Sequence, residues 1–209
     1  MTIANRKIGL GVMGFADVLI RLGIPYDSDE AIEVAEKIMQ TIQDESKAAS
    51  ADLAKERGAF PNFAKSTYAE EGIAPLRNAT TTTIAPTGTI SIIANSSSGV
   101  EPVFALAYER NVMDNDILVE ANPLFEAIAK ENGFYSDELM HRIAEHGSAK
   151  DIDDIPEDFR RIFVTAHDIS PEWHIKIQAA FQKFTDNAVS KTVNFANSAT
   201  VKDLSLIHI

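Results

Sequence analysis

Cysteine is absent from this chain of 209 residues. Its absence excludes disulfide bonds, thiolate metal sites and thiol catalysis within these residues. Long apolar runs are absent too: the most apolar stretch, residues 8–24, is interrupted by Asp17 and Arg21. A membrane span needs about 18 or more apolar residues in succession, so none is expected. The amino end lacks the charged-then-apolar order of a secretory signal, and a cytoplasmic location is therefore expected.

Basic residues are scarce relative to acidic ones. The chain has 19 Lys and Arg against 31 Asp and Glu, a formal net charge of −12. The sequence offers no basic cluster to collect nucleic-acid phosphates, so binding of DNA or RNA is not expected. This charge does not argue against a nucleotide pocket, because backbone N–H groups can hold phosphate without net positive charge.

A long uncharged stretch lies between Arg77 and Glu101. Its first half, residues 79–85, is rich in β-branched side chains and predicts a buried strand. Residues 90–94 predict a short helix. The N–H groups of a first helical turn point at one spot, and neighbouring hydroxyls add donors. The turn between this strand and this helix is therefore a candidate anion-binding site.

The candidate phosphate-binding site consists of the residues in and just after that turn, which are Pro86, Thr87, Gly88, Thr89, Ile90 and Ser91. An ordinary strand-to-helix turn accounts for the same residues, because Gly and Thr suit such turns for conformational reasons alone. The turn matches neither a P-loop nor a dinucleotide-binding fingerprint. Spacing alone therefore leaves both interpretations open.

Strand and helix signals alternate along the rest of the chain. Strands are expected at residues 7–13, 79–85, 104–112 and 190–195, helices at 15–22, 28–56, 90–94, 123–131, 136–145, 156–162 and 170–185, a loop at 59–76 and a turn at 114–116. Two glycines in the first strand indicate close approach of another backbone or a ligand. Asp27, followed by Glu30, is expected to cap the long helix. This alternation favours an α/β architecture with mostly parallel strands.

Five titratable residues outside the turn are further candidates for chemistry: Glu101, His167, Asp168, His174 and Lys191. Glu101 is either a catalytic acid or base or a surface carboxylate. The two histidines and Asp168 form an acid/base pair, ligate a metal, or fix the loop before the last helix. The last interpretation is favoured, and no metal site is expected, because no third ligand lies at metal spacing. Lys191 contacts a phosphate, contacts a carboxylate or faces solvent.

Five motifs, taken in order, resemble the large catalytic chain of class II ribonucleotide reductase, the adenosylcobalamin-dependent type. They lie at residues 5–17, 85–91, 98–102, 166–174 and 186–194, and include the runs Pro-Thr-Gly-Thr and Gly-Val-Glu-Pro. The resemblance covers nearly the whole chain. It implies that residues 1–203 are a fragment of the reductase barrel domain and that residues 204–209 are an unrelated or disordered tail.

The resemblance also implies a fold and an activity. The family fold is a ten-stranded α/β barrel of two parallel five-stranded halves, and this chain resembles the carboxyl-terminal half. The family reduces ribonucleotides to 2′-deoxyribonucleotides through a cobalamin-initiated thiyl radical, and its substrate phosphates rest on the turn that matches Pro86–Ser91. The implied partners are adenosylcobalamin, a ribonucleoside di- or triphosphate, a thioredoxin-like dithiol and a second copy of the chain.

The missing cysteines are the main departure from the family. The radical cysteine and the reducing pairs have no counterpart here, so no catalytic residue is expected within this chain, and the isolated chain is expected to be inactive. Half a barrel also exposes strand edges and apolar faces, so marginal stability or aggregation is expected. Two alternatives stay open: a fragment of the diiron-dependent class I large subunit, and a non-catalytic module that binds nucleotide or phosphate.

Overall fold

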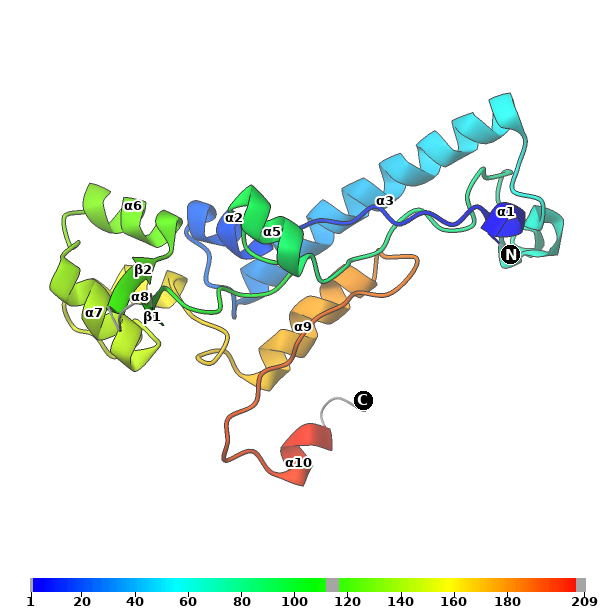
Figure 1. Cartoon of the computed structure of the whole chain (residues 1–209). Coiled ribbons are helices and arrows are strands. Elements are labelled where there is room, and N and C mark those ends of the chain that lie inside the picture. The colour runs from blue at the N-terminus through cyan, green and yellow to red at the C-terminus, as the bar shows by residue number, and fades with distance from the viewer. Residues whose placement is uncertain (1, 112–116, 206–209) are drawn as a thin grey trace.

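The computed structural model describes residues 2–111 and 117–205, and helices dominate them. The elements in chain order are α1 (Thr2–Asn5), α2 (Phe15–Leu22), α3 (Asp29–Arg57), the 3₁₀ turn η1 (Phe63–Lys65), α4 (Thr67–Glu70), α5 (Gly88–Ala94), β1 (Ala107–Asn111), β2 (Ile117–Ala121), α6 (Pro123–Glu131), α7 (Asp137–His146), α8 (Glu157–Ile162), α9 (Pro171–Gln182) and α10 (Val201–Leu204). The molecule is elongated, with the long helix α3 along much of its length (Figure 1). None of the helices described is long and apolar enough to cross a membrane.

All the predicted helices are present, with ends that differ by a few residues at most. Short helices were missed: α1 at the amino end, η1 and α4 within the predicted loop, and α10. Each of these spans four residues or fewer, too short for the helical spacing of apolar residues to repeat. The predicted boundary of a tail at residue 204 stays a prediction.

The parallel strands predicted from sequence are present as short, extended segments in the middle of the molecule. Parallel bridges join Leu10 to Thr82, Ile84 to Val189, and Val103 to Thr165. The amide of Leu10 donates to the carbonyl of Thr81 at 2.8 Å. Each segment pairs over too few residues to form a regular strand. The prediction of a strand at residues 190–195 is wrong, because the pairing ends near residue 190.

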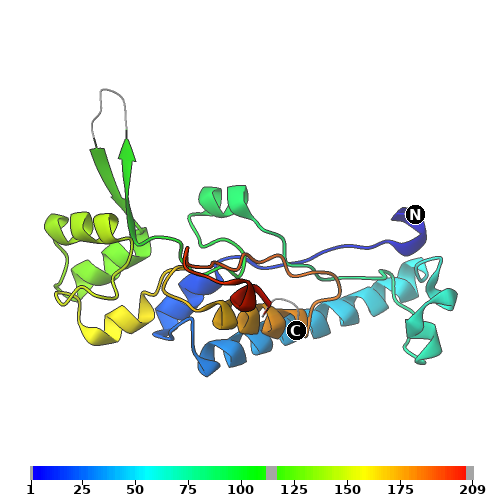
Figure 2. The ribbon, with the colours of Figure 1, turned by 90° about the horizontal axis from the view of Figure 1, so that it is seen from below.

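The regular strands of the described residues form an antiparallel hairpin. β1 pairs with β2 in a register that sets Ala107 opposite Ala121. The predicted strand at residues 104–112 contains β1, whereas β2 was missed. The turn predicted at residues 114–116 lies outside the described residues. This hairpin projects from the α6–α8 end of the molecule (Figure 2).

The glycines of the first predicted strand mark a close approach of two backbones, as expected. A Cβ atom at Gly11 would lie 2.1 Å from the carbonyl oxygen of Thr83. One at Gly9 would lie 2.2 Å from the Cγ2 atom of the same threonine. Residue 11 therefore has to be glycine for residues 8–11 to lie against residues 80–84, whereas a side chain at residue 9 would require the Thr83 side chain to move.

Helix α3 is capped by Ser28 rather than by Asp27, so that prediction is wrong by one residue. Ser28 has extended backbone angles, and its hydroxyl oxygen accepts from the amide of Ala31 at 3.2 Å. The chain therefore enters the helix one residue later than the Asp27–Glu30 spacing indicates. Ser136 caps α7 in the same way, accepting from the amide of Leu139.

The core extends from the contact of α2, α3 and α9 to the packing among α6, α7 and residues 149–163. The rings of Phe15 on α2 and Phe181 on α9 pack edge to face, with centroids 4.9 Å apart. Helices α3 and α9 lie side by side in both views (Figures 1 and 2). Helix α5 instead stands off the core, and Ile92 and Ile93 are each 80% exposed. Because apolar side chains are exposed in this way, the isolated chain is expected to aggregate.

Asp186 connects α3 to the parallel segments. One carboxylate oxygen accepts from the Lys47 ammonium at 2.7 Å and the Thr81 amide at 2.6 Å, and the other accepts from Gln43 at 2.7 Å. Burial alone would raise the pKa of Asp186, but the hydrogen bonds from Lys47, Thr81 and Gln43 outweigh it and lower the pKa. The charged form is therefore the one that holds these elements together.

Replacing Asp186 by Asn is expected to lower the free energy of unfolding at pH 7 by about 2 kcal/mol, because the Lys47 ion pair is lost. The pKa of Asp186 is lower in the folded state, so its stabilisation is complete above the unfolded pKa of about 3.9 and disappears as pH falls through the folded pKa. Urea denaturation of wild type and variant from pH 7 to pH 3 measures this. A stability difference that stays constant over that range would contradict the assignment.

Candidate functional site

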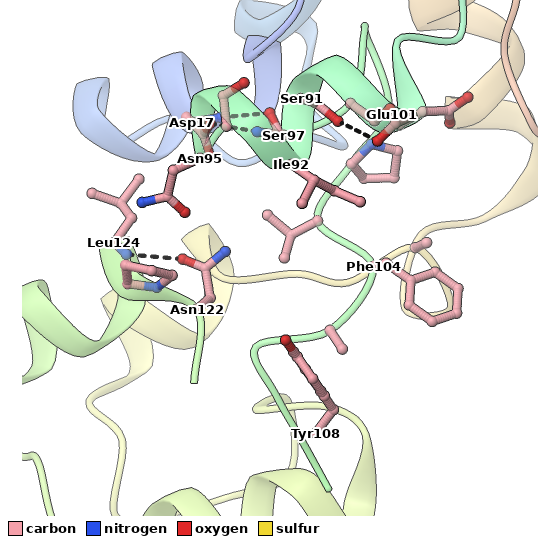
Figure 3. A pocket seen from close by; sticks show the side chains of 18 of the residues that line it. Asp17, Ser91, Ile92, Asn95, Ser97, Glu101, Phe104, Tyr108, Asn122 and Leu124 are labelled. Carbon is pink, nitrogen blue, oxygen red and sulfur yellow. Dashed lines mark hydrogen bonds between the residues drawn. The ribbon is translucent and has the colours of Figure 1, made fainter. Parts of the chain in front are cut away.

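A pocket of about 1040 Å³ lies between α5, the loop that follows it, the start of α6 and residues 192–194 (Figure 3). Gly88 and Ser91 of the predicted site line it on one side, with Glu101, Thr192 and Asn194 also in the wall. Its volume is at the upper end of the range for small-molecule sites. The pocket therefore has room for a ligand of nucleotide size.

The turn that opens α5 has the geometry of an anion cradle. Thr87 precedes the helix with left-handed backbone angles, φ 56° and ψ 18°. The amides of Gly88, Thr89 and Ile90 follow as the first helical turn. Within the described part of the chain, these three amides have no protein acceptor. Free N–H groups at a helix start attract anions.

The hydroxyls of Thr87, Ser91 and Ser98 hold the shape of the turn instead of adding free donors, whereas the Thr89 side chain is exposed. Thr87 Oγ1 accepts from the Gly99 amide at 2.7 Å, and the Ser98 hydroxyl donates to the Pro86 carbonyl at 2.7 Å. Ser91 is buried and donates to the Gly88 carbonyl at 3.1 Å. The three backbone amides and the exposed Thr89 side chain are thus the groups that stay available to an anion.

The six predicted site residues do not all face the pocket. Gly88 and Ser91 line it, and Thr87 is half-buried beside it. The remaining three, Pro86, Thr89 and Ile90, have exposed side chains. Of these three, Thr89 and Ile90 have a free backbone N–H, whereas Pro86 has none to offer.

Asp17 fastens the loop after α5 to the start of α2, a role that sequence reasoning missed. Its carboxylate accepts from the Ser97 amide at 2.7 Å, and the Gly14 amide donates to the Ser97 carbonyl at 2.8 Å (Figure 3). Gly99, two residues later, has φ 49°, and a Cβ there would lie 3.2 Å from the Ala85 carbonyl oxygen. The loop and the cradle are therefore held as one unit.

Lys191 contacts a carboxylate, one of the three alternatives that the sequence left open. Its side chain is 0% exposed, and its ammonium lies 3.0 Å from Glu101 Oε2, 2.8 Å from His174 Nδ1 and 3.0 Å from the Thr192 carbonyl oxygen. An ammonium has three N–H donors, and each has an acceptor here. Burial lowers the pKa of Lys191, and the Glu101 charge opposes this shift.

His174 is fully buried, and each of its ring nitrogens has a hydrogen-bond partner. Its Nδ1 accepts from Lys191, so the proton lies on Nε2, which donates to the Ala166 carbonyl at 3.1 Å. Burial lowers the pKa of His174, and the Lys191 charge lowers it further. The neutral ring therefore serves as an acceptor that orients Lys191.

The loop before α9 is fixed by Asp168, as the favoured interpretation predicted. Its carboxylate accepts from the amide and the hydroxyl of Thr165 and from the hydroxyl of Ser148, all within 2.9 Å. His167 packs its ring against Phe104, with centroids 5.7 Å apart. Among the described residues, no three His, Cys, Asp or Glu side chains converge as a metal site would require.

Comparison with known proteins assigns this arrangement to a family. The family described as "Ribonucleotide reductase, barrel domain" matches residues 2–75 and 69–209. The structure is similar to the Actinobacillus ureae class Id ribonucleotide reductase alpha subunit, with a TM-score of 0.81, 27% identity, and coverage of 99% of this chain and 36% of that one. The chain therefore belongs to the ribonucleotide reductase barrel family, and the predicted partial α/β barrel is confirmed.

Sequence identity to individual reductases indicates which class of the family this chain resembles most. The chain is 55% identical over 205 residues to a vitamin B12-dependent ribonucleoside-diphosphate reductase of Thermoplasma acidophilum, covering 98% of this chain and 26% of that protein. It is 48% identical to the enzyme of the same name from Mycobacterium tuberculosis, covering 99% and 29%. The chain is 29% identical to the ribonucleoside-diphosphate reductase subunit alpha of Chlamydia pneumoniae, covering 93% of this chain and 22% of that protein. The resemblance to class II is thus confirmed, and the chain spans under a third of these relatives' length.

Proposed function

We propose that this chain forms the part of a vitamin B12-dependent ribonucleoside-diphosphate reductase that holds the substrate's phosphates. The observation that carries the proposal is the cradle of three free amides, Gly88, Thr89 and Ile90, at the edge of a pocket of nucleotide size. Because the site binds through the backbone, an acidic chain can accept an anionic substrate. The names of the relatives, vitamin B12-dependent ribonucleoside-diphosphate reductases, support the reaction and the cofactor.

In this proposal the chain binds and orients the ribonucleotide. The cradle amides bind the phosphates, which leaves the ribose facing the pocket wall at Thr192 and Asn194. Thiol chemistry has to come from other residues of the reductase, because these 209 contain no cysteine. A thioredoxin-like dithiol renews those thiols, and the whole reductase works as a homodimer in the cytoplasm.

We propose that two exposed apolar side chains of the pocket contribute to the cofactor site. Phe104 is 70% exposed and Ile92 is 80% exposed, and both line the pocket (Figure 3). Apolar side chains of this kind suit the face of a corrin ring. When bound, adenosylcobalamin supplies the initiating radical, and Ile92 and Phe104 would contribute to its contact surface.

A chimeric reductase tests the proposal. In this chimera, the matching 205 residues of the Thermoplasma acidophilum relative are replaced by the present chain. We expect it to form 2′-deoxyribonucleotides from ribonucleoside diphosphates in the presence of adenosylcobalamin and a dithiol. The unmodified relative is the positive control. A folded chimera that lacks this activity would contradict the proposal.

The isolated chain is expected to form no deoxyribonucleotide under the same conditions, because it has no cysteine to carry a thiyl radical. Chromatographic assay of the products measures this, with the chimera as the matched control. Any deoxyribonucleotide above background from the isolated chain would refute the role assigned to outside thiols.

A further inference from the structure

A carboxylate, an ammonium and an imidazole form a chain of contacts beside the pocket. Glu101 lines the pocket, Lys191 is fully buried behind it, and His174 on α9 lies beyond Lys191. Tyr26 lies next to this group. Its hydroxyl donates to the Val100 carbonyl at 2.6 Å, and its ring centroid is 5.8 Å from the Lys191 ammonium. Segments far apart in the sequence therefore meet at Lys191.

Both carboxylate oxygens of Glu101 are engaged. Oε2 accepts from Lys191 at 3.0 Å, and Oε1 accepts from the Thr192 amide at 2.7 Å. A surface carboxylate would leave both of these oxygens to solvent. The geometry instead makes Glu101 a clamp that holds the backbone of residues 191–192 against the loop that follows the cradle.

This clamp holds one part of the pocket wall in place. Thr192 and Asn194 line the pocket, but residues 191–194 form no regular strand that would hold them in place. Their position relative to Gly88 depends on the contacts that Lys191 and Glu101 make. Loss of those contacts would let the wall move by distances that matter for substrate orientation.

The contact between Lys191 and Glu101 also changes the net charge at the pocket wall. Glu101 is 22% exposed and faces a pocket that we propose receives an anionic substrate. Like charges at short range in a partly buried site repel strongly. The Lys191 ammonium cancels this repulsion. His174 is the acceptor that keeps the ammonium in place without adding charge.

We propose that Glu101, Lys191 and His174 are positioning residues that fix the Thr192–Asn194 wall and neutralise the carboxylate facing the substrate. This inference rests on the proposed function, because its ligand is the ribonucleotide bound at the cradle. None of the three residues reacts with the substrate. They act through the pocket wall and through its charge.

The test uses the chimera with Lys191→Met, and Lys183→Met as the matched control. Lys183 lies near the carboxyl end of α9, 57% exposed, and pairs only with Glu36 among the described carboxylates. We expect Lys191→Met to raise KM for the ribonucleoside diphosphate about tenfold or more while kcat changes less than about threefold. The double variant Glu101→Gln/Lys191→Met leaves no buried charge unpaired but still lacks the Lys191 contacts, so we expect it to recover only part of the KM.

Hydrogen exchange measured by mass spectrometry supplies a readout independent of activity. Lys191→Met should speed exchange in residues 189–194, whereas Lys183→Met should not. If the wild-type chimera is inactive, the proposed function fails and the exchange result still decides the positioning role. A folded Lys191→Met chimera with wild-type KM and wild-type exchange would overturn the inference. If the Lys191→Met chimera does not fold, the same exchange measurement is made on the double variant. Wild-type exchange in residues 189–194 of the double variant would also overturn the inference.

Discussion

Replacing Thr89 by proline in the chimera is expected to raise KM for a ribonucleoside diphosphate at least about tenfold. Proline removes the backbone N–H of Thr89, one of the three free donors of the cradle. A hydrogen bond to a charged acceptor contributes about 1.5–3 kcal/mol, which corresponds to a factor of roughly 10 to 150. Proline is tolerated in the first turn of a helix, so α5 should persist. The preceding residue, Gly88, is the residue type least restricted before proline.

Thr89→Ala is the matched control for this substitution. It removes the exposed hydroxyl but keeps the amide, so KM should stay within about threefold of wild type. Steady-state kinetics on both variants measures the contrast. Equal KM values for the two variants would show that the Thr89 amide does not bind the substrate.

Gly11→Ala is expected to destabilise the fold by about 3 kcal/mol, the largest stability effect we foresee for one methyl group. The added Cβ would lie 2.1 Å from the Thr83 carbonyl oxygen, so one of two paired backbones has to move. That movement breaks the bond from the Thr83 amide to the Leu10 carbonyl, now 2.9 Å. Residues 80–84 lead directly into the cradle, and the damage should reach the site.

Gly88→Ala is the matched control for stability. Nothing lies within 4 Å of a Cβ at Gly88, and its backbone is helical, so the free energy of unfolding should change by less than about 1 kcal/mol. Chemical denaturation of the two chimeric variants compares them. A Gly11→Ala variant as stable as Gly88→Ala would contradict the close approach of residues 8–11 to residues 80–84.

Helices and the cradle could be predicted from sequence because their signals are local. Gly14 and Gly23 bound α2, and Pro86 through Thr89 mark the turn before α5. The cap of α3 shows the limit of such signals: Asp27 and Ser28 are both good capping residues, and the entry angle of the chain decides between them. Strand β2 was missed because its five residues carry no long alternating pattern.

The partners of Lys191 could not be predicted from its neighbours. Glu101 is 90 residues away along the chain, and His174 is 17 residues away on a different element. The choice among phosphate, carboxylate and solvent depends on which segments tertiary packing brings together. The same applies to the end of pairing near Ser190, whose amide bonds to the Ile84 carbonyl at 2.9 Å. The occurrence of Gly9 and Gly11 within a predicted strand indicated a close approach, but the sequence did not show that Thr83 would be their neighbour.

The most direct test of the central claim is a crystal structure of the chimera with a ribonucleoside diphosphate bound. Our account predicts phosphate oxygens about 2.7–3.2 Å from the amide nitrogens of Gly88, Thr89 and Ile90. It also predicts that the Lys191–Glu101 pair is intact behind the ribose. Phosphates bound elsewhere, with these three amides facing solvent, would contradict the account.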